Sequence, residues 1–283
     1  MPGPFTRILS DIHYGDHASR VQRLAQLRPL LDGPAHIVLN GDTLDTRRGP
    51  RPAFTTELHA EILSWISGAP IPLDLLTGNH DPDISALHHL TLGDGQILVT
   101  HGDVIFDNIV PWGRDAAHIS RLIDAELARL DPTACTRLAT RLAIWRRVAA
   151  QIPQRHQSEA NRLKYLLNFA ADTVWPPLRI FRVIDAWRNA PRLSAELARQ
   201  HYPQASFILT GHTHRPGIWR QPNGVTVINT GSFCPPTGGY TVDLHPTKII
   251  IRRIESRHDE FHAGAPLAEF SLAAPRPSPT LPS

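Results

Sequence analysis

Five short clusters of Asp, Asn and His residues occur along the chain, and each follows a strand-like run of apolar residues. The clusters are Asp11-Ile12-His13, Gly41-Asp42, Gly78-Asn79-His80-Asp81, His101-Gly102-Asp103 and Gly211-His212-Thr213-His214. In open α/β sheets, the loops that follow the strands carry the chemistry. Five such loops at one edge of a sheet can therefore converge on a single site, and this constrains the chain to an α/β fold.

The first hundred residues alternate between strand and helix signals. Residues 18–31 and 55–67 carry apolar side chains at helical spacing, and strand-like runs lie before, between and after them. This β-α-β-α-β order predicts a largely buried sheet with helices against its faces.

The pattern becomes helical after Asp107. Helical spacing recurs in five stretches, which are 116–130, 133–151, 158–175, 178–187 and 193–201. We therefore expect residues 1–107 and 204–270 to form the core and residues 108–203 to form a helical insert, or cap. The stretch 114–199 holds fifteen Arg or Lys against eight Asp or Glu. This excess favours contact with an anionic substrate or a membrane surface, with a solvated helix face as the alternative.

Strand signals return after the insert. Short β-rich runs cover 206–210, 225–229, 240–244 and 248–254. Turn residues at Asn223-Gly224 and His245-Pro246 predict antiparallel strands joined by hairpins. The last residues, 271–283, are rich in Pro and Ser, and we expect a disordered tail there.

Composition places the chain among ordinary globular proteins, with 41% hydrophobic and 19% charged residues. No apolar run approaches the ~20 residues that span a bilayer. The start, Met1-Pro2-Gly3-Pro4, lacks a basic region and an apolar segment, so we expect no secretory signal and a cytoplasmic location, peripheral to the inner membrane if the insert binds it. Cys135 and Cys234 are far apart in sequence, and we expect each to be a buried apolar residue.

The joint occurrence of the clusters indicates a metal site, because any one of them alone is a common turn. Carboxylate and imidazole ligands suit manganese, iron and zinc. The donors outnumber the needs of one ion, so we expect two divalent ions that share a carboxylate. Mn²⁺ is favoured, with iron and zinc as alternatives.

The five motifs, in this order over residues 11–214, resemble those of the calcineurin-like metallophosphoesterases. The resemblance implies an α/β sandwich of two mixed sheets flanked by helices, with a dinuclear metal centre at one edge. By this resemblance, Asp42 bridges the two ions, and the other ligands divide between them. The first ion is held by Asp11, His13 and His214, and the second by Asn79, His101 and His212.

The resemblance also implies roles for residues beside the metals. His80 contacts the phosphoryl group and helps to protonate the leaving oxygen. We expect Asp81 to orient His80, as supporting groups commonly do for a working imidazole. Asp45 is either a supporting residue or a turn residue, and both interpretations stay open. Asn229 is expected to support the site edge.

A family member of this kind hydrolyses a phosphoester or pyrophosphate bond with metal-activated hydroxide. The position of the insert is similar to that in the UDP-2,3-diacylglucosamine pyrophosphohydrolases, which suggests a small acylated phosphorylated substrate. That subgroup usually has Arg where this chain has His80. A nuclease and a non-catalytic scaffold are the alternatives, although the chain lacks the interleaved aromatic and basic residues of a recognised single-strand platform, so nucleic acid is not favoured.

Overall fold

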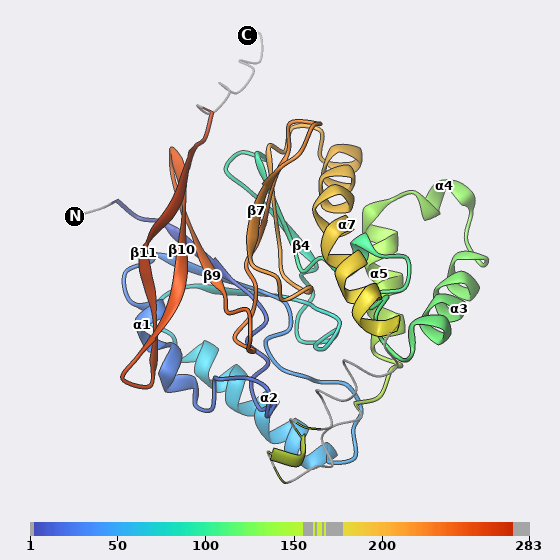
Figure 1. The fold of residues 1–283 in the computed structure, drawn as a ribbon, viewed down its shortest axis with the longest axis horizontal. Coiled ribbons are helices and arrows are strands. Elements are labelled where there is room, and N and C mark those ends of the chain that lie inside the picture. The colour runs from blue at the N-terminus through green and yellow to red at the C-terminus, as the bar shows by residue number, and fades with distance from the viewer. Residues whose placement is uncertain (1–2, 155–160, 162, 166, 168–177, 274–283) are drawn as a thin grey trace, which may run out of the picture.

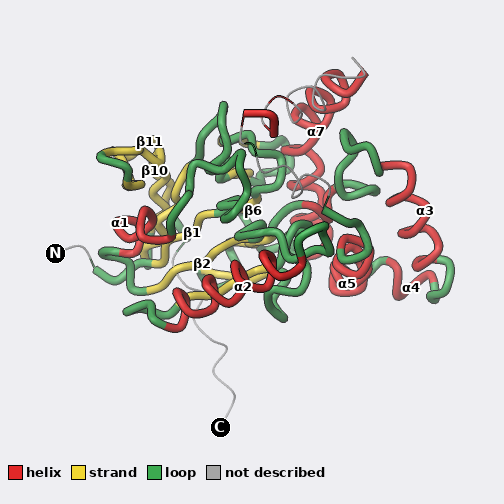
Figure 2. The backbone as a smooth tube through the Cα atoms, turned by 90° about the horizontal axis from the view of Figure 1, so that it is seen from below, coloured by secondary structure: helices red, strands yellow, loops and turns green. Residues whose placement is uncertain are grey.

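The structure is a computed structural model that describes residues 3–154, 161, 163–165, 167 and 178–273. Two sheets pack face to face, and helices cover the outer face of each (Figures 1 and 2). Most of the predicted helix over 158–175, and the predicted tail from residue 274 onward, lie outside the described residues.

The first sheet has six strands in the order β11-β10-β9-β1-β2-β3. Its strands are β1 (Thr6–Leu9), β2 (His36–Asn40), β3 (Leu73–Leu76), β9 (Tyr240–His245), β10 (Lys248–Arg257) and β11 (Glu260–Ser271). The strands β1, β2 and β3 are parallel, whereas β9, β10 and β11 are antiparallel.

The second sheet has five strands in the order β4-β5-β6-β8-β7. Its strands are β4 (His89–Leu92), β5 (Ile97–Thr100), β6 (Phe207–Thr210), β7 (Gly217–Arg220) and β8 (Thr226–Asn229). Here β5, β6 and β8 are parallel, and the edge strands β4 and β7 are antiparallel to their neighbours. Both sheets are therefore mixed, as the family resemblance implied.

The alternation of side chains along the buried strands builds a layered core. Ile8 and Val38 point between the two sheets, where they pack with Val99 and Leu209. Their neighbour Leu39 belongs instead to the cluster under the helices of the first sheet. Because side chains alternate across a strand with a period of two, strands that are apolar on both sides indicate a sheet covered on both faces.

Helices cover the outer faces. The first sheet is flanked by α1 (Arg28–Leu31), which follows the 3₁₀ turn η1 (Leu24–Leu27), and by α2 (Pro52–Ser67). The second is flanked by α5 (Leu138–Ala149) and α7 (Leu178–His201), and α3 (Ala116–Leu127) and α4 (Pro132–Cys135) pack against α5. All four helices follow the 3₁₀ turn η2 (Asp103–Ile105). Figure 1 shows α7 beside the second sheet and α3 and α4 at the far end of the molecule. The role of this helical region as a cap stays a prediction.

The predicted helix over residues 18–31 is wrong in its first half. Only η1 and α1 are helical, because the preceding residues bond to the site loops instead. The Ser19 hydroxyl donates to the Ile12 carbonyl at 2.6 Å, and the Arg20 N–H donates to the Phe233 carbonyl at 3.2 Å. Short polar side chains that bond to nearby backbone compete with the helical pattern.

Two further differences concern the later part of the chain. The strands β6 and β8 are parallel rather than a hairpin, because the unpredicted strand β7 lies between them in sequence and pairs with β8 across the Asn223-Gly224 turn. The two predicted helices over 178–187 and 193–201 form one helix, α7, which continues through Pro191. One face of α7 packs against β6 and β8, and this packing offsets the hydrogen bond that proline removes. The pair β9 and β10 is antiparallel, as predicted.

The described helices include none that combines the length and the apolar character needed to cross a membrane.

Candidate metal centre

The five polar clusters meet at one edge of the sandwich. They follow the parallel-paired strands β1, β2, β3, β5 and β6, so their loops lie at the carboxyl ends of those strands. Backbone hydrogen bonds join loops that are distant in sequence. The His13 N–H donates to the Asp42 carbonyl at 2.9 Å, and the Gly211 N–H donates to the His101 carbonyl at 2.8 Å.

Four predicted ligands form a first group. Ligand atoms of Asp11, His13, Asp42 and His214 all lie within 4.8 Å of one another. The Nε2 atoms of His13 and His214 are 3.1 Å apart, and His214 Nε2 lies 3.2 Å from Asp11 Oδ1. Asp11 and Asp42 are almost completely buried, so their negative charges lie out of reach of bulk water.

A second group shares Asp42 with the first. Ligand atoms of Asp42, His101 and His212 also lie within 4.8 Å of one another. His101 Nε2 is 3.3 Å from Asp42 Oδ2 and 3.3 Å from Asn79 Oδ1. The structure therefore brings all seven predicted ligands together and places Asp42 between the two groups.

Hydrogen bonds to backbone carbonyls orient two of the imidazoles. His101 Nδ1 lies 3.0 Å from the Asn40 carbonyl oxygen, and His212 Nε2 lies 2.8 Å from the Ile109 carbonyl oxygen. A carbonyl oxygen can only accept, so each of these nitrogens carries the proton. The other ring nitrogens, His101 Nε2 and His212 Nδ1, are then the ones that can bind a cation when they carry no proton, which is the usual arrangement for histidine ligands.

Backbone strain is concentrated in the same loops. Non-glycine residues with positive φ are uncommon and tend to cluster at functional sites. Five of the predicted ligands have this conformation, namely Asp11 (53°), His13 (49°), Asp42 (51°), His212 (65°) and His214 (53°). The fold holds these residues in strained positions that aim their side chains at a common centre.

Two glycines in the motifs make room for the carboxylates. A Cβ on Gly78 would overlap Asp42 Oδ1, and a Cβ on Gly211 would overlap Asp11 Oδ2. The backbone therefore approaches each carboxylate so closely that only glycine fits. This requirement explains the glycine that begins each of these two clusters.

Burial and mutual charges set the protonation states. Burial lowers the pKa of His13 to about 4, and burial together with the charge of His101 lowers the pKa of His212 to about 3. Burial alone would raise the pKa of Asp42, but the charges of His101 and His80 hold it well below its usual value. The pKa of His101 is raised well above its usual value, because the charge of Asp42 outweighs the effect of burial. Near neutral pH the site thus offers ionised carboxylate and neutral imidazole ligands, with one proton held between Asp42 and His101.

These residues fit a pair of divalent cations. The first group offers carboxylate and imidazole donors, and the second adds the amide oxygen of Asn79. This mixture of nitrogen and oxygen donors suits manganese, iron or zinc. Two buried carboxylates in one cluster also need positive charge nearby, since burying an unpaired charge is costly. The assignment of each residue to an ion stays a prediction.

His80 lies beside the first group and is held by two charged side chains. Its Nδ1 is 2.9 Å from Asp45 Oδ2 and 2.8 Å from Arg47 Nη2, and its ring meets the His13 ring edge-on at a centroid distance of 5.0 Å. Burial and the charge of Arg47 lower the pKa of His80, but the charges of Asp42 and Asp45 outweigh them and raise it overall. The raised pKa favours the protonated form of the His80 imidazole, which can donate a proton.

The expectation that Asp81 orients His80 is corrected by these contacts. The Asp81 carboxylate accepts hydrogen bonds from the backbone N–H groups of Gly78 at 2.7 Å, Asp42 at 3.0 Å and Thr43 at 2.6 Å. It therefore ties the loop after β3 to the loop after β2. Asp45, whose role the sequence left open, provides the carboxylate that contacts the His80 ring, at Nδ1.

Asn229, the other predicted supporting residue, lies under the Gly211–His214 loop. Its Nδ2 donates to the Gly211 carbonyl at 2.6 Å and to Thr213 Oγ1 at 3.1 Å, and its Oδ1 accepts from the Gly231 N–H at 2.9 Å. Asn229 at the end of β8 thereby fixes the backbone between His212 and His214.

Two residues near the predicted ligands were not identified from the sequence. Arg47 lies two positions after Asp45, and its guanidinium contacts both Asp45 and His80, with Nη2 2.6 Å from Asp45 Oδ2. Cys234 was expected to be a plain apolar residue, yet its sulfur lies within 4.8 Å of ligand nitrogens of His13 and His214. The sequence did contain a hint of the role of Cys234, because this residue lies shortly after the strand that ends at Asn229, as the ligand clusters lie after their strands.

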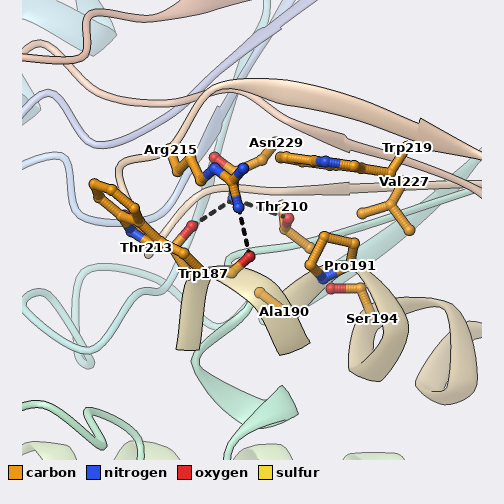
Figure 3. Close-up of a pocket in the computed structure, with 10 residues that line it drawn as sticks. All are labelled: Trp187, Ala190, Pro191, Ser194, Thr210, Thr213, Arg215, Trp219, Val227 and Asn229. Carbon is orange, nitrogen blue, oxygen red and sulfur yellow. Dashed lines mark hydrogen bonds between the residues drawn. The ribbon is translucent and has the colours of Figure 1, made fainter. Parts of the chain in front are cut away.

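The helical region contacts the site loops from several directions. Trp187 Nε1 on α7 donates to the Thr213 carbonyl at 2.9 Å, and Arg215 Nη1 donates to the Trp187 carbonyl at 2.7 Å (Figure 3). Gln154 Nε2 donates to the Asp45 carbonyl at 2.7 Å. Residues between the fourth and fifth clusters thus border the metal ligands.

Comparison with solved structures finds weak similarity over most of the chain. Vacuolar protein sorting 29 from Cryptosporidium parvum has a TM-score of 0.42 at 15% identity, covering 96% of this chain and 100% of that one. A predicted phosphoesterase from Streptococcus pneumoniae TIGR4 has a TM-score of 0.40 at 16% identity, covering 96% and 99%. A dimetal phosphatase from Danio rerio has a TM-score of 0.45 at 12% identity, covering 89% and 96%. A search of curated proteins gave no significant match.

The match to a family model identifies the family of the chain. The model of the calcineurin-like phosphoesterase family matches residues 7–216. The match extends from β1 to just beyond the fifth cluster, so it includes every predicted metal ligand and His80. The chain belongs to the calcineurin-like phosphoesterase family.

Proposed function

We propose that this chain is a metal-dependent hydrolase that cleaves a phosphoester or pyrophosphate bond. The observation that carries the proposal is the position of Asp42 in both groups of ligands, where one carboxylate can serve two ions. Two divalent cations there would offset the charge of the phosphoryl group, supply an activated water and orient the ester for in-line attack. Mn²⁺ suits the nitrogen and oxygen donors, with iron and zinc as alternatives.

The chain's own residues have distinct tasks in this reaction. Asp42 holds the two halves of the site together, and the His101 and His212 rings are fixed by their backbone partners. His80 carries the proton for the leaving oxygen, because Asp45 binds its Nδ1 and leaves Nε2 to face a substrate. Arg47, beside both residues, adds a positive charge near the phosphoryl position.

We further propose an acylated, anionic substrate similar to UDP-diacylglucosamine. The first turns of α7 leave large apolar side chains in water, with Leu178 65% and Phe181 67% exposed. Arg182 is exposed in the same stretch. Further along, the same helix contacts the loop of His212 and His214 through Trp187. An apolar surface with basic side chains that leads towards the metals fits acyl chains attached to a phosphorylated head, at or near a membrane surface.

Activity assays on the purified chain test the reaction. We expect hydrolysis of bis-p-nitrophenyl phosphate or p-nitrophenyl phosphate after loading with Mn²⁺, and loss of hydrolysis in Asp42→Ala. A folded, metal-loaded chain that cleaves neither compound nor UDP-diacylglucosamine would support the non-catalytic scaffold instead. Cleavage of nucleic acid, with binding that weakens steeply as salt increases, would support the nuclease.

A matched pair of variants tests the acylated substrate. Phe181→Ser is expected to raise KM for UDP-diacylglucosamine and to leave turnover of bis-p-nitrophenyl phosphate unchanged. Leu267→Ser is the control, because Leu267 is an exposed apolar residue (47%) on β11, in the other sheet. Equal effects of the two variants on both substrates would remove α7 from substrate binding.

A further inference from the structure

Cys234 lies next to the first group of metal ligands. Its sulfur and ligand nitrogens of His13 and His214 are all within 4.8 Å of one another, a spacing that one ion could bridge. Its side chain is buried, with 8% of the residue exposed. Cys234 therefore forms a separate candidate group with His13 and His214, two residues that also belong to the first group, and it is the only sulfur donor among the described candidate groups.

The loop that carries Cys234 is fixed to the metal ligands. The Phe233 N–H donates to the Asp11 carbonyl at 3.1 Å, and the Phe233 side chain is 1% exposed. The Cys234 N–H donates to Ser232 Oγ at 3.0 Å. These bonds fix the backbone at Phe233 and Cys234, so the position of the sulfur beside His13 is built into the fold.

We propose that Cys234 is a ligand, as a thiolate, of a cation that His13 and His214 hold. This inference rests on the proposed metal-dependent function and adds a donor to the same site. On binding, a sulfur–metal bond forms, and the S–H proton passes to solvent or buffer. Before binding, burial and the charges of Asp16 and Asp11 raise the pKa of the thiol, so the apoprotein holds it protonated. A divalent cation reverses the local charge and can deprotonate a coordinating thiol.

The consequence is a difference in metal preference between the two positions. Thiolate is a soft ligand that favours zinc or iron, whereas carboxylate and amide oxygens suit manganese. The second group, Asp42, His101, His212 and Asn79, offers nitrogen and oxygen donors. We therefore expect zinc or iron at the first position and manganese to be retained better at the second.

The alternative is a packing role. Cys234 also contacts Ala18 and Tyr165 in a small apolar cluster, where a thiol acts as a small hydrophobic side chain. In that case the sulfur would make no bond to a cation. Spectroscopy of the metal-loaded protein separates the two roles without reference to activity.

Cobalt(II) provides the test, because a cobalt–thiolate bond gives a charge-transfer band in the near ultraviolet. The full chain loaded with cobalt is expected to show this band, and Cys234→Ser is expected to lose it while keeping the visible bands from nitrogen and oxygen ligands. Cys135→Ser is the matched control, since Cys135 lies in α4 with its sulfur 3.6 Å from the Leu127 carbonyl oxygen, and the band should remain.

Two outcomes would overturn the inference and leave the proposed function intact. One is cobalt bound with visible bands but without the charge-transfer band, and the other is a band that persists in Cys234→Ser. If the wild-type chain bound no cobalt at all, the metal-dependent function itself would fail. If Cys234→Ser does not fold, the cadmium-113 chemical shift of the cadmium-loaded wild-type chain tests the same bond, because sulfur ligation shifts this resonance strongly. A shift typical of nitrogen and oxygen ligands alone would refute the bond.

Discussion

Asp45 Oδ2 lies 2.9 Å from His80 Nδ1, and this contact decides which nitrogen of His80 can act on a substrate. A carboxylate can only accept, so Nδ1 donates to Asp45 and Nε2 is left to transfer a proton. Arg47 bonds to the same carboxylate through Nη2 at 2.6 Å. The ion pair therefore fixes the carboxylate, and the carboxylate in turn fixes the imidazole.

Replacing Asp45 with Asn should weaken the effect of this side chain on the orientation and the pKa of His80. Asp45 raises the pKa of His80, so Asp45→Asn should lower that pKa, and the loss of activity at high pH should begin at a lower pH. We expect kcat to decrease by about 10- to 100-fold, the usual scale for a partner that orients a working residue. The pH profile of kcat checks the prediction. An unchanged profile with a full loss of bound metal would mean that Asp45 supports the ligands rather than His80.

Variants of Asp42 and of His80 should distinguish the loss of metal binding from the loss of proton transfer. Asp42→Ala removes a carboxylate from both groups, so we expect loss of both ions or of nearly all activity. His80→Ala should keep the metals and reduce turnover by about 10²–10⁴-fold, the scale for losing a general acid. Elemental analysis and steady-state kinetics on both variants check this. Full activity in His80→Ala would exclude His80 from the mechanism.

Much of this site was visible in the sequence, because each ligand cluster follows a strand and the parallel strands end at the same edge. The error at Asp81 has a simple physical cause. Asp81 is adjacent to His80 in sequence, but its side chain points to the backbone of the neighbouring loop, and the spatial neighbour of His80 comes from 35 positions earlier. Contacts between distant segments depend on how loops are packed, which local patterns do not record.

The errors in the fold have a similar origin. Residues 18–23 have helical spacing, yet Ser19 and Arg20 bond to the loops of the site, so tertiary contacts override the local preference. The strand β7 has the short sequence Gly-Ile-Trp-Arg, and its pairing with β8 is what makes it a strand. Cys234 was treated as an apolar residue because only the folded chain brings its sulfur to His13.

Asp81 should be important for stability as well as for metal binding. Burial and the charge of Asp42 raise its pKa to about 7, and bound cations that offset Asp42 should keep it ionised. Asp81→Asn leaves one oxygen for three backbone N–H donors, and each lost bond to a charged group is worth about 1.5–3 kcal/mol. We expect the free energy of unfolding of the metal-loaded Asp81→Asn variant, measured in urea, to fall by at least the value of one such bond. Asp83→Asn, at a neighbouring exposed position, is the control and should unfold like the wild type.

The contact between Trp187 and Thr213 should link the helical region to the metal ligands. The Trp187 ring lies on one side of Arg215 and the Trp219 ring on the other, with the guanidinium 5.8 Å and 5.3 Å from the ring centroids (Figure 3). Trp187→Phe keeps an aromatic ring there but leaves the Thr213 carbonyl without its donor, at a cost of about 1–3 kcal/mol.

We expect Trp187→Phe to lower the free energy of unfolding by that amount and to weaken metal binding, because Thr213 lies between two ligands. Trp219→Phe is the matched control, since it changes the other ring and keeps the Trp187–Thr213 hydrogen bond. Equal destabilisation by the two variants, with metal affinity unchanged in both, would show that Trp187 acts only through packing.

The proton between Asp42 and His101 should make binding of the second cation depend on pH. The charge of Asp42 raises the pKa of His101 above its ordinary value, so His101 is protonated in the apoprotein near neutral pH. A cation that binds His101 must displace this proton. Its affinity should therefore increase with pH until His101 is deprotonated in the apoprotein, and below that point it should fall about tenfold for each unit of pH.

Calorimetric titration with Mn²⁺ in buffers of different ionisation enthalpy measures the number of protons released. The measurement is best made in Cys234→Ser, so that the thiol contributes no proton, and we expect about one proton for the second ion. His13 and His212, whose pKa values are lowered to about 4 and about 3, are already neutral and should contribute none. Binding of the second ion without proton release would show that Asp42 and His101 share no proton in the apoprotein.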